Sequence, residues 1–287
     1  MSRIAYVNGR YAPHCEAAVH VEDRGYQFSD GVYEVIMVRA GRMVDGNGHL
    51  ERLGRSLEAV KIDWPMNRRS LEVVIGEVVR RNRLRDGFIY LQVTRGVVRR
   101  DHQFPDNIQP SLVMTARRCA VLADSLDDLG VGVITIPDTR WKRCDIKSIS
   151  LLSNVLSKQE AREAGAYEAW LVDEEGYVTE GASSNAWIVT GAGGLVTRPV
   201  GRALLGGVTR QTVLELARGE GVALCERPFT VEEARVAAEA FLTSTTSFIK
   251  PVVSIDGVKV GAGRPGPVCA SLTALYAAYV KAQGGGE

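Results

Sequence analysis

One lysine stands out among the side chains that could do chemistry, because the chain carries most of its positive charge on arginine. Lys147 is followed by a small and apolar run over residues 148–152. Arginine stays protonated and cannot act as an amine nucleophile, whereas a desolvated lysine loses its proton readily and can form a Schiff base with a carbonyl. The alternative is a solvated or ion-paired lysine, and the local sequence alone favours that alternative.

Two segments in the second half of the chain could bind a phosphate group. Gly206 and Gly207 precede Thr209, which opens an expected helix over residues 209–220. Glycines let the backbone approach an anion, and a helix N-terminus supplies free N–H groups. The second segment is a hydroxyl cluster over residues 243–247. Neither segment decides alone, because a Gly-Gly pair before a helix is more often a simple turn and Ser/Thr runs usually cap themselves.

A third segment places an acid at the end of an expected strand. Glu180 follows residues 177–179 and precedes small residues, which leave room for a flat ring. Such a carboxylate could keep a pyridinium nitrogen protonated, and a pyridoxal cofactor needs that charge to act as an electron sink. The alternative is a helix-capping or surface acid, and the local sequence favours it.

Length and composition limit the class of protein. A chain of 287 residues with 45% hydrophobic residues exceeds the usual single-core size and favours two domains. A net charge of +1 argues against nucleic-acid or membrane-surface binding. Five widely spaced cysteines without a C-x-x-C pair indicate neither a disulfide framework nor a zinc site, and no metal is expected. Without a signal peptide or an apolar span of ~20 residues, a soluble cytoplasmic protein is expected.

The elements that would position these residues mix strands with helices. In the first half, strands are expected over residues 4–7, 31–39 and 88–95, and helices over 50–60 and 70–82. In the second half, strands are expected over 130–137, 167–172 and 177–179, helices over 151–165, 209–220, 231–239 and 268–283, and a hairpin at 256–257. The order is too irregular for a doubly wound sheet, so the expected class is α+β. Residues 117–129 lose periodicity and collect charge, which predicts a linker between a small domain over 1–120 and a larger one over 121–287.

Five stretches of the chain are typical of one enzyme family. They are Asp23–Val35, Val93–Gly96, His102–Pro105, Arg140–Ser148 and Thr243–Ser247. In content and order they resemble the fold-type IV pyridoxal-phosphate enzymes, the class IV aminotransferases, and within them the bacterial D-amino-acid transaminases. The resemblance extends over nearly the whole chain. It implies a two-domain α+β fold, pyridoxal 5'-phosphate as cofactor, and a C-terminal domain that binds this cofactor.

The resemblance also implies roles for individual residues around the cofactor. Lys147 would hold the cofactor through a Schiff base and move the proton between the substrate α-carbon and the cofactor C4′. Glu180 would pair with the pyridinium nitrogen, and Ser183 and Ser184 would line the ring. The implied phosphate contacts are Arg52, Val208, Thr209 and Thr245. A guanidinium combined with backbone N–H groups suits a dianion.

The first domain would choose the substrate. Arg100 and His102 have the Arg-x-His spacing with which D-amino-acid transaminases hold the substrate α-carboxylate, and Tyr33 would help. The resemblance implies that this loop reaches the active site of a neighbouring subunit, so a homodimer with active sites at the subunit interface is expected. The chain departs from the family where Arg99 replaces an expected proline and residues 97–98, two valines, replace more polar ones. Arg99 could compete for the carboxylate or face solvent, and we expect the latter.

The expected reaction is transfer of an amino group from a D-amino acid such as D-alanine to a 2-oxo acid such as 2-oxoglutarate, giving pyruvate and D-glutamate. The same fold hosts branched-chain L-amino-acid transaminases, (R)-selective amine transaminases and aminodeoxychorismate lyases, so the fold alone does not decide. The spacing of Arg100 and His102 favours the D-amino-acid reaction. The alternative from another class is a non-catalytic phosphate-binding module in which Lys147 is merely ion-paired.

Overall fold

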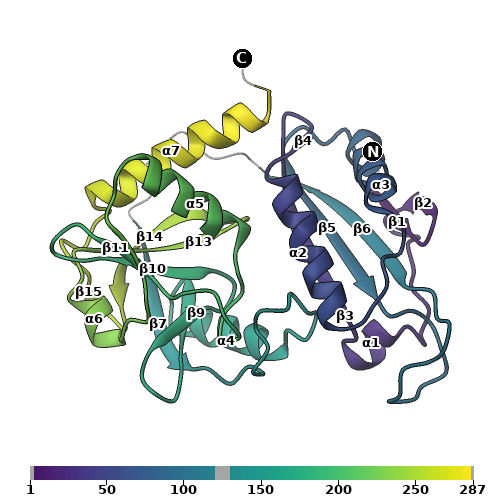
Figure 1. The fold of residues 1–287 in the computed structure, drawn as a ribbon, viewed down its shortest axis with the longest axis horizontal. Coiled ribbons are helices and arrows are strands. Elements are labelled where there is room, and N and C mark those ends of the chain that lie inside the picture. The colour runs from purple at the N-terminus through teal and green to yellow at the C-terminus, as the bar shows by residue number, and fades with distance from the viewer. Residues whose placement is uncertain (1–2, 120–129, 286–287) are drawn as a thin grey trace. The chain divides into compact units, whose positions relative to one another are not determined.

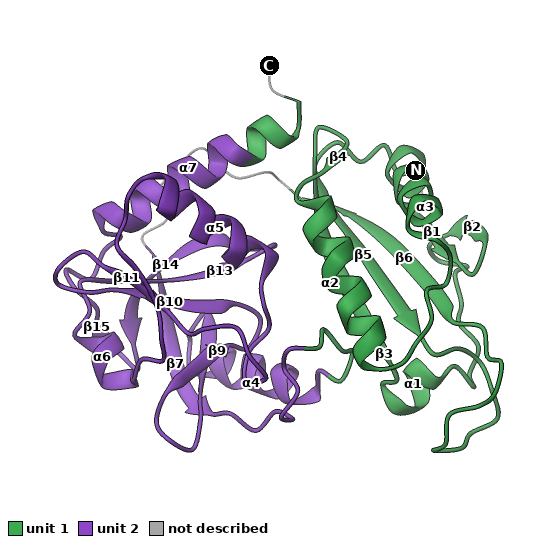
Figure 2. Ribbon diagram, in the orientation of Figure 1, with its two compact units in different colours: residues 1–121, 146–150, 280–287 green, residues 122–145, 151–279 purple. Residues whose placement is uncertain are grey.

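The computed structural model describes residues 3–119 and 130–285, and the chain divides into two compact units (Figure 1). Unit 1 comprises residues 1–121, 146–150 and 280–287, and unit 2 comprises residues 122–145 and 151–279 (Figure 2). The segment around Lys147 therefore groups with the N-terminal part of the chain. The predicted boundary at 120–121, most of the predicted linker and the last two residues lie outside the described residues.

Unit 1 is built on a six-stranded sheet in the order β2-β1-β6-β5-β3-β4, with antiparallel neighbours throughout. The strands are β1 (Ile4–Val7), β2 (Arg10–Pro13), β3 (Gly31–Arg39), β4 (Arg42–Met43), β5 (Gly87–Thr94) and β6 (Ser111–Arg118). The helices are α1 (Arg24–Phe28), α2 (Gly46–Ala59) and α3 (Arg68–Arg81). The predicted strands over 4–7 and 31–39 are confirmed to the residue.

The alternation of side chains along β3 separates the two faces of this sheet. One face packs against α2 and α3 in a single core that includes Ile36, Leu53 and Ile75, all without exposed surface. Successive side chains of a strand point to opposite faces. Glu34 therefore enters the core beside α2, while Tyr33 lies on the other, half-buried face.

Unit 2 contains a nine-stranded mixed sheet in the order β12-β11-β10-β13-β14-β7-β8-β9, with β15 paired to β14. Its strands are β7 (Val131–Pro137), β8 (Glu168–Val172), β9 (Val178–Gly181), β10 (Asn185–Val189), β11 (Leu195–Thr197), β12 (Leu224–Glu226), β13 (Glu239–Ser244), β14 (Phe248–Ile255) and β15 (Val258–Lys259). Its helices are α4 (Leu152–Glu163), α5 (Val208–Gly219), α6 (Val231–Arg235) and most of α7 (Pro267–Gln283). With unit 1, this sheet confirms the α+β class. Within the described ranges, no helix is long and apolar enough to cross a membrane.

One predicted helix is wrong at its end. The helix expected over 231–239 ends at Arg235, and Glu239 instead begins β13, opposite Val189 of β10. The buried Glu239 carboxylate accepts hydrogen bonds from the backbone N–H groups of Val268 (2.9 Å) and Cys269 (2.8 Å). Pairing within the sheet and this cap of α7 outweigh the local helical pattern.

Candidate active site

The backbone around Lys147 is fixed to the sheet and to a helix of unit 1. The N–H of Tyr33 donates to the Lys147 carbonyl at 3.0 Å, and the N–H of Ile149 donates to the Gly31 carbonyl at 3.0 Å. On the other side, the N–H of Lys147 donates to Ser56 Oγ of α2 at 3.2 Å. These contacts hold the lysine backbone between the start of β3 and α2.

The Lys147 side chain lies over an aromatic ring. Its Nζ is 4.3 Å from the centroid of the Tyr33 ring, a cation–π arrangement. Lys147 is half-buried, and it forms no ion pair with any residue of 3–119 or 130–285. The structure thus brings together two predicted site residues and does not support the ion-paired alternative.

Tyr33 in turn stacks on a second tyrosine of the same sheet face. The rings of Tyr33 and Tyr90 lie 5.7 Å apart with 30° between their planes. Burial, helped by Tyr33, raises the pKa of Tyr90 to about 12, and its hydroxyl donates to Gln92 Oε1 at 2.6 Å. Tyr90 therefore stays a neutral phenol. The sequence did not identify Tyr90 or Gln92.

The predicted phosphate ligand Arg52 belongs to a buried charge cluster. Its Nε and Nη2 donate to the two carboxylate oxygens of Glu34, each at 2.8 Å. His49, one turn earlier in α2, lies with Nδ1 2.8 Å from Glu34 Oε2. Burial alone would raise the pKa of Glu34, but the charge and hydrogen bonds of Arg52, with those of His49, lower it to about 2. Glu34 is therefore ionised and orients Arg52.

Sequence reasoning missed Glu34 and His49. The available signal was an acid in the middle of an apolar strand, which is costly unless it is paired. A second signal was the spacing of His49 and Arg52, three residues apart on one helix face.

The predicted carboxylate loop is exposed but anchored at its base. The Arg24 guanidinium donates to the carbonyls of Asp101 and Gln103, and its Nε donates to Asp30 at 2.7 Å. Arg95 donates to both oxygens of Asp30, at 2.8 and 2.9 Å. A buried arginine pair on one carboxylate thus fixes where the loop leaves the sheet.

Both predicted residues of this loop meet at Phe28. The Arg100 guanidinium lies 4.8 Å from the centroid of the Phe28 ring, and the His102 ring lies 5.3 Å from it. Within the described ranges, neither makes a hydrogen bond or ring contact with Tyr33. Arg99 is exposed to solvent, as expected.

Glu180 lies in unit 2, near the end of β9, with only 5% of its surface exposed. Its Oε1 accepts a hydrogen bond from Arg140, and its Oε2 accepts one from Asn185 Nδ2 at 3.1 Å. The N–H of Leu205 lies 3.2 and 3.1 Å from the two oxygens. The alternative of a surface or helix-capping acid is therefore wrong.

Arg140 is shared between two carboxylates. It donates from Nε and Nη2 to Asp138 at 2.9 and 2.8 Å, and from Nη1 to Glu180. Burial raises the pKa of Glu180 to about 6 although Arg140 opposes the shift. The hydrogen bonds and charge of Arg140 outweigh burial at Asp138 and lower its pKa. At neutral pH, both carboxylates are ionised around one guanidinium.

The two serines that follow Glu180 are bound by a second buried acid. The hydroxyls of Ser183 and Ser184 donate to Glu168 Oε2 at 2.7 and 3.2 Å. Lys158 pairs with the other oxygen of Glu168 at 3.2 Å. Glu168 thus holds the turn that links β9 to β10, because two residues of that turn donate hydrogen bonds to it.

The predicted phosphate turn is tied to the Glu180 cluster. Helix α5 starts at Val208, and its N-cap is Gly207, which provides no side-chain cap. A Cβ at position 207 would clash with Asn185 Oδ1, so only glycine fits there. Asn185 also donates to the Leu205 carbonyl at 2.9 Å, and Thr209 is buried at 3% exposure. One asparagine therefore connects the Gly-Gly turn with Glu180.

Thr245 lies in the tight turn between β13 and β14 of unit 2. The N–H of Ser247 donates to Ser244 Oγ at 2.9 Å, so the hydroxyl run caps itself in part, as the alternative for this segment describes. The buried Thr243 hydroxyl accepts from Trp187 Nε1 at 2.9 Å. Thr245 is half-buried between these two bonded positions.

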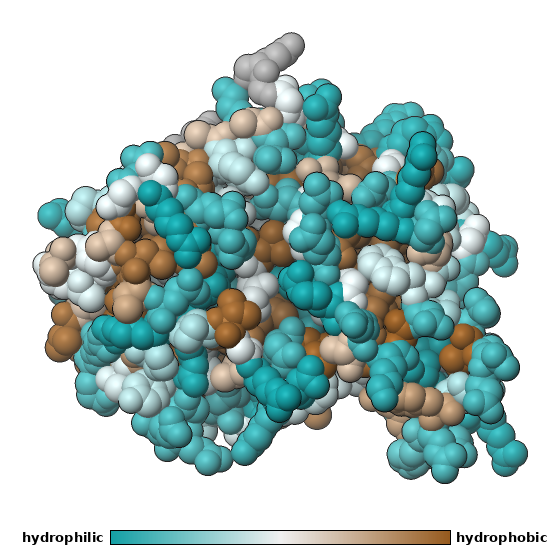
Figure 3. Space-filling model, in the orientation of Figure 1, coloured by the Kyte–Doolittle hydropathy of each residue, from teal (hydrophilic) through white to brown (hydrophobic). Residues whose placement is uncertain are grey.

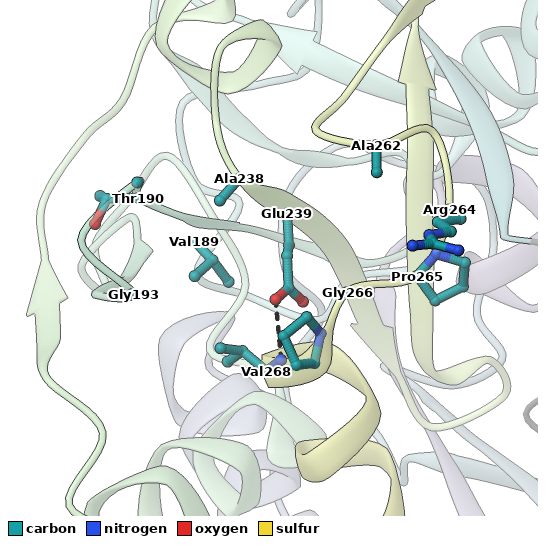
Figure 4. Close-up of a pocket in the computed structure, with 12 residues that line it drawn as sticks. Val189, Thr190, Gly193, Ala238, Glu239, Ala262, Arg264, Pro265, Gly266 and Val268 are labelled. Carbon is teal, nitrogen blue, oxygen red and sulfur yellow. Dashed lines mark hydrogen bonds between the residues drawn. The ribbon is translucent and has the colours of Figure 1, made fainter.

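A pocket of about 530 Å³ lies elsewhere in unit 2, beside the N-terminus of α7 (Figure 4). Glu239 projects into it, and a dashed line marks its hydrogen bond with Val268. The residues that line it include none of the predicted site residues. Among the residues described, no cluster of three or more His, Cys, Asp or Glu could hold a metal ion.

The chain is similar to known proteins along most of its length. The family model described as amino-transferase class IV matches residues 31–255. A D-alanine aminotransferase of Bacillus licheniformis is 43% identical over 262 residues, 91% of this chain and 91% of that protein. A D-alanine aminotransferase of Staphylococcus haemolyticus is 38% identical over 97% of this chain and 98% of that protein. The solved branched-chain aminotransferase of Thermoproteus uzoniensis with norvaline has a TM-score of 0.88 at 27% identity, covering 99% of this chain and 96% of that chain.

Proposed function

Because the chain belongs to the class IV aminotransferases, we propose that it transfers the amino group of D-amino acids such as D-alanine to 2-oxo acids such as 2-oxoglutarate, giving pyruvate and D-glutamate. The observation that carries this proposal is the 43% identity to a D-alanine aminotransferase over 91% of both chains. The solved branched-chain enzyme shares only 27% of its residues with this chain. The branched-chain L-amino-acid and (R)-amine reactions are therefore the weaker candidates.

The residues present suit pyridoxal 5'-phosphate, the cofactor of this family, which supplies an electron sink for the substrate α-carbon. Lys147 offers a half-buried amine without an ion pair in the described ranges. Glu180 offers a buried carboxylate for a ring nitrogen. The start of α5 offers N–H groups, and its N-cap residue, Gly207, has no side chain to cap them, which suits a phosphate. These donors and acceptors match the three polar parts of the cofactor.

In the proposed site, Lys147 binds the cofactor covalently and afterwards carries the proton to and from the substrate α-carbon. Glu180 holds the ring nitrogen protonated, and Ser183 and Ser184 line the ring. The proposed phosphate ligands are Arg52, Val208, Thr209 and Thr245. Glu34 supports this assignment for Arg52, because it fixes the guanidinium with two hydrogen bonds.

The proposed substrate contacts are Arg100, His102 and Tyr33, which bind the α-carboxylate. The anchored loop supports this role, because Arg100 and His102 converge on one ring, that of Phe28, and remain exposed. We further propose that the loop serves the active site of a second subunit.

A homodimer is supported by an apolar stripe on α4. Leu152, Val155 and Leu156 share one helix face and are 73%, 59% and 61% exposed. Hydrophilic side chains predominate on the face drawn in Figure 3, where apolar side chains form separate patches. Exposed apolar clusters on a soluble protein mark interaction surfaces.

Light scattering should give the mass of two chains for the wild type and of one chain for Val155→Asp. A wild-type monomer with full activity would contradict the dimer.

The proposal includes a cytoplasmic location. All five cysteines are free thiols. Disulfides are rare in the reducing cytosol, where free thiols persist.

The test of the proposed function is a substrate panel. D-Alanine should convert bound pyridoxal phosphate to the pyridoxamine form much faster than L-leucine or (R)-1-phenylethylamine. The absorbance of the cofactor measures the rate of this conversion. A preference for L-leucine or for the amine would replace the D-amino-acid reaction with that alternative.

The role of Lys147 has its own test. Lys147→Ala should lose at least ~10²–10⁴-fold in rate, the usual contribution of a general base, and should still bind cofactor through its phosphate. Borohydride reduction of the wild type should label Lys147. The exposed Lys142, replaced by Ala, is the matched control and should keep its activity. Label on another lysine would overturn the assignment.

A further inference from the structure

Arg140 joins two carboxylates that are nearly sealed from water. The exposed fractions of the side chains are 6% for Arg140, 12% for Asp138 and 7% for Glu180. In the described part of the chain, no other basic side chain is hydrogen-bonded to Glu180. Arg140 also donates to the Ala203 carbonyl at 3.1 Å, next to the turn that contains Leu205.

We propose that Arg140 is a positioning residue that keeps the buried Glu180 ionised, and that Asp138 limits this effect by competing for the same guanidinium. The inference rests on the proposed function, because an ionised Glu180 is what a protonated cofactor nitrogen requires. It assigns to this reaction two residues that act through Glu180 rather than on the substrate.

The physical basis is the cost of burying a charge. A carboxylate removed from water takes up a proton unless a cation or hydrogen-bond donors stabilise its charged form. The neutral donors at Glu180, Asn185 Nδ2 and the Leu205 N–H, contribute hydrogen bonds but no charge. Arg140 therefore supplies the positive charge that opposes protonation.

Asp138 acts on Glu180 in the opposite direction. It accepts two hydrogen bonds from the Arg140 guanidinium, one from the Arg140 backbone N–H and one from the Thr179 hydroxyl at 2.8 Å. Its negative charge disfavours a second negative charge on Glu180. Cys144 is a further titratable neighbour among the described residues, and burial raises its pKa to about 11, so its thiol is neutral at physiological pH.

The experiment follows the ionisation of Glu180 directly. The full-length protein, labelled with 13C-glutamate, is titrated by NMR with and without bound pyridoxal phosphate, and Glu180→Gln identifies the Glu180 carboxyl signal. Without cofactor, Arg140→Gln should move the Glu180 midpoint up by at least about one pH unit, because the positive charge that opposes protonation is lost. One pH unit is a tenfold change in the ionisation equilibrium. Asp138→Asn should move the midpoint down. Opposite shifts are a signature that a merely structural role for these residues would not produce.

A matched control is available in the same unit. Arg227 makes a two-bond pair with Glu233, and both side chains are about one-third or more exposed. Arg227→Gln should leave the Glu180 midpoint unchanged. Should Arg140→Gln fail to fold, Arg140→Lys retains the charge but forms fewer bonds and should give a smaller upward shift, while Asp138→Asn still tests the opposite direction.

The outcomes separate this inference from the proposed function. Unchanged midpoints, or shifts of the same sign in Arg140→Gln and Asp138→Asn, would overturn the role of Arg140 even if the wild type transaminates D-alanine. If the wild type neither binds pyridoxal phosphate nor transaminates, the proposed function fails, yet opposite shifts would still establish that Arg140 controls Glu180. At pH values below both midpoints, Arg140→Gln should weaken the affinity for pyridoxal phosphate about tenfold, matching a one-unit shift, and at neutral pH the loss should be less than about twofold.

Discussion

Two buried glutamates, one in each unit, meet arginine in different ways. Glu34 of unit 1 has no exposed surface and Glu180 of unit 2 has 5%. Each accepts hydrogen bonds from an arginine, yet the pKa of Glu34 is lowered to about 2 and that of Glu180 is raised to about 6. Burial is common to both, so it does not explain the difference.

The difference lies in how many hydrogen bonds each carboxylate receives from its arginine. Glu34 receives two hydrogen bonds from Arg52 and a third contact from His49. Glu180 receives one from Arg140, which gives two to Asp138. Asp30 follows the same rule, because the pair of arginines that binds it lowers its pKa against burial. A carboxylate that receives two or more hydrogen bonds from arginine has a lowered pKa, whereas one whose arginine is bound mainly to a second carboxylate does not.

The largest expected effect is on stability at Glu34. Glu34→Gln leaves Arg52 buried without its anionic partner and should lower the free energy of unfolding by about 3–5 kcal/mol. Glu180→Gln should lower the free energy of unfolding much less, because the ionisation of the wild-type Glu180 carboxyl already opposes folding at neutral pH. Urea unfolding of both cofactor-free variants checks the order, and an equal or reversed order would break the comparison.

The next effect concerns catalysis at Glu180. Glu180→Gln should fold normally but slow the single-turnover reaction with D-alanine roughly 10²–10³-fold, the usual loss when one electrostatic contact of a transition state is removed. A neutral amide cannot stabilise a pyridinium charge. Stopped-flow absorbance measures the step, and an unchanged rate would remove the chemical role of Glu180.

The pH dependence of stability should differ in sign between the two acids. The Glu34 contribution is present above its unfolded pKa near 4.5 and is lost as pH falls towards about 2. For Glu180, stability is greatest below pH 4.5 and decreases as pH rises through about 6. That shift of about 1.5 units corresponds to roughly 2 kcal/mol. Measuring the free energy of unfolding at several pH values in wild type and Glu180→Gln isolates the Glu180 contribution. Parallel dependences on pH between 4.5 and 6.5 would contradict it.

The smallest expected effect sharpens the contrast between buried and exposed cations. Arg100 is exposed, unlike Arg52 and Arg140, so Arg100→Ala should leave the unfolding free energy nearly unchanged. It should raise the D-alanine concentration needed for half-maximal rate roughly tenfold, because one charge-assisted bond is lost. An amine without a carboxylate should be affected far less. Arg99→Ala is the matched control. Equal effects of the two variants would mean that Arg100 has no specific role in binding the substrate α-carboxylate.

Much of the fold could be predicted from the sequence. The strands over 4–7 and 31–39 agree to the residue, because one buried face imposes alternation on a strand. The predicted helix over 209–220 is α5, displaced by one residue, since its Gly-Gly start is a local signal. The helix over 231–239 was too long, because the pairing of Glu239 with β10 involves residues distant in sequence.

The sequence by itself determined the family, the two-unit α+β class and the candidates Lys147 and Glu180, because these depend on residue type and local spacing. Only the tertiary structure decided which side chains surround them. Arg140 meets Glu180 across forty positions of sequence, and Tyr33 lies under Lys147 because residues 146–150 pair with β3. Ionisation depends on burial and on charges a few ångströms away. Distances of that kind are set by packing, so the opposite behaviour of Glu34 and Glu180 could not be read from their positions in the chain.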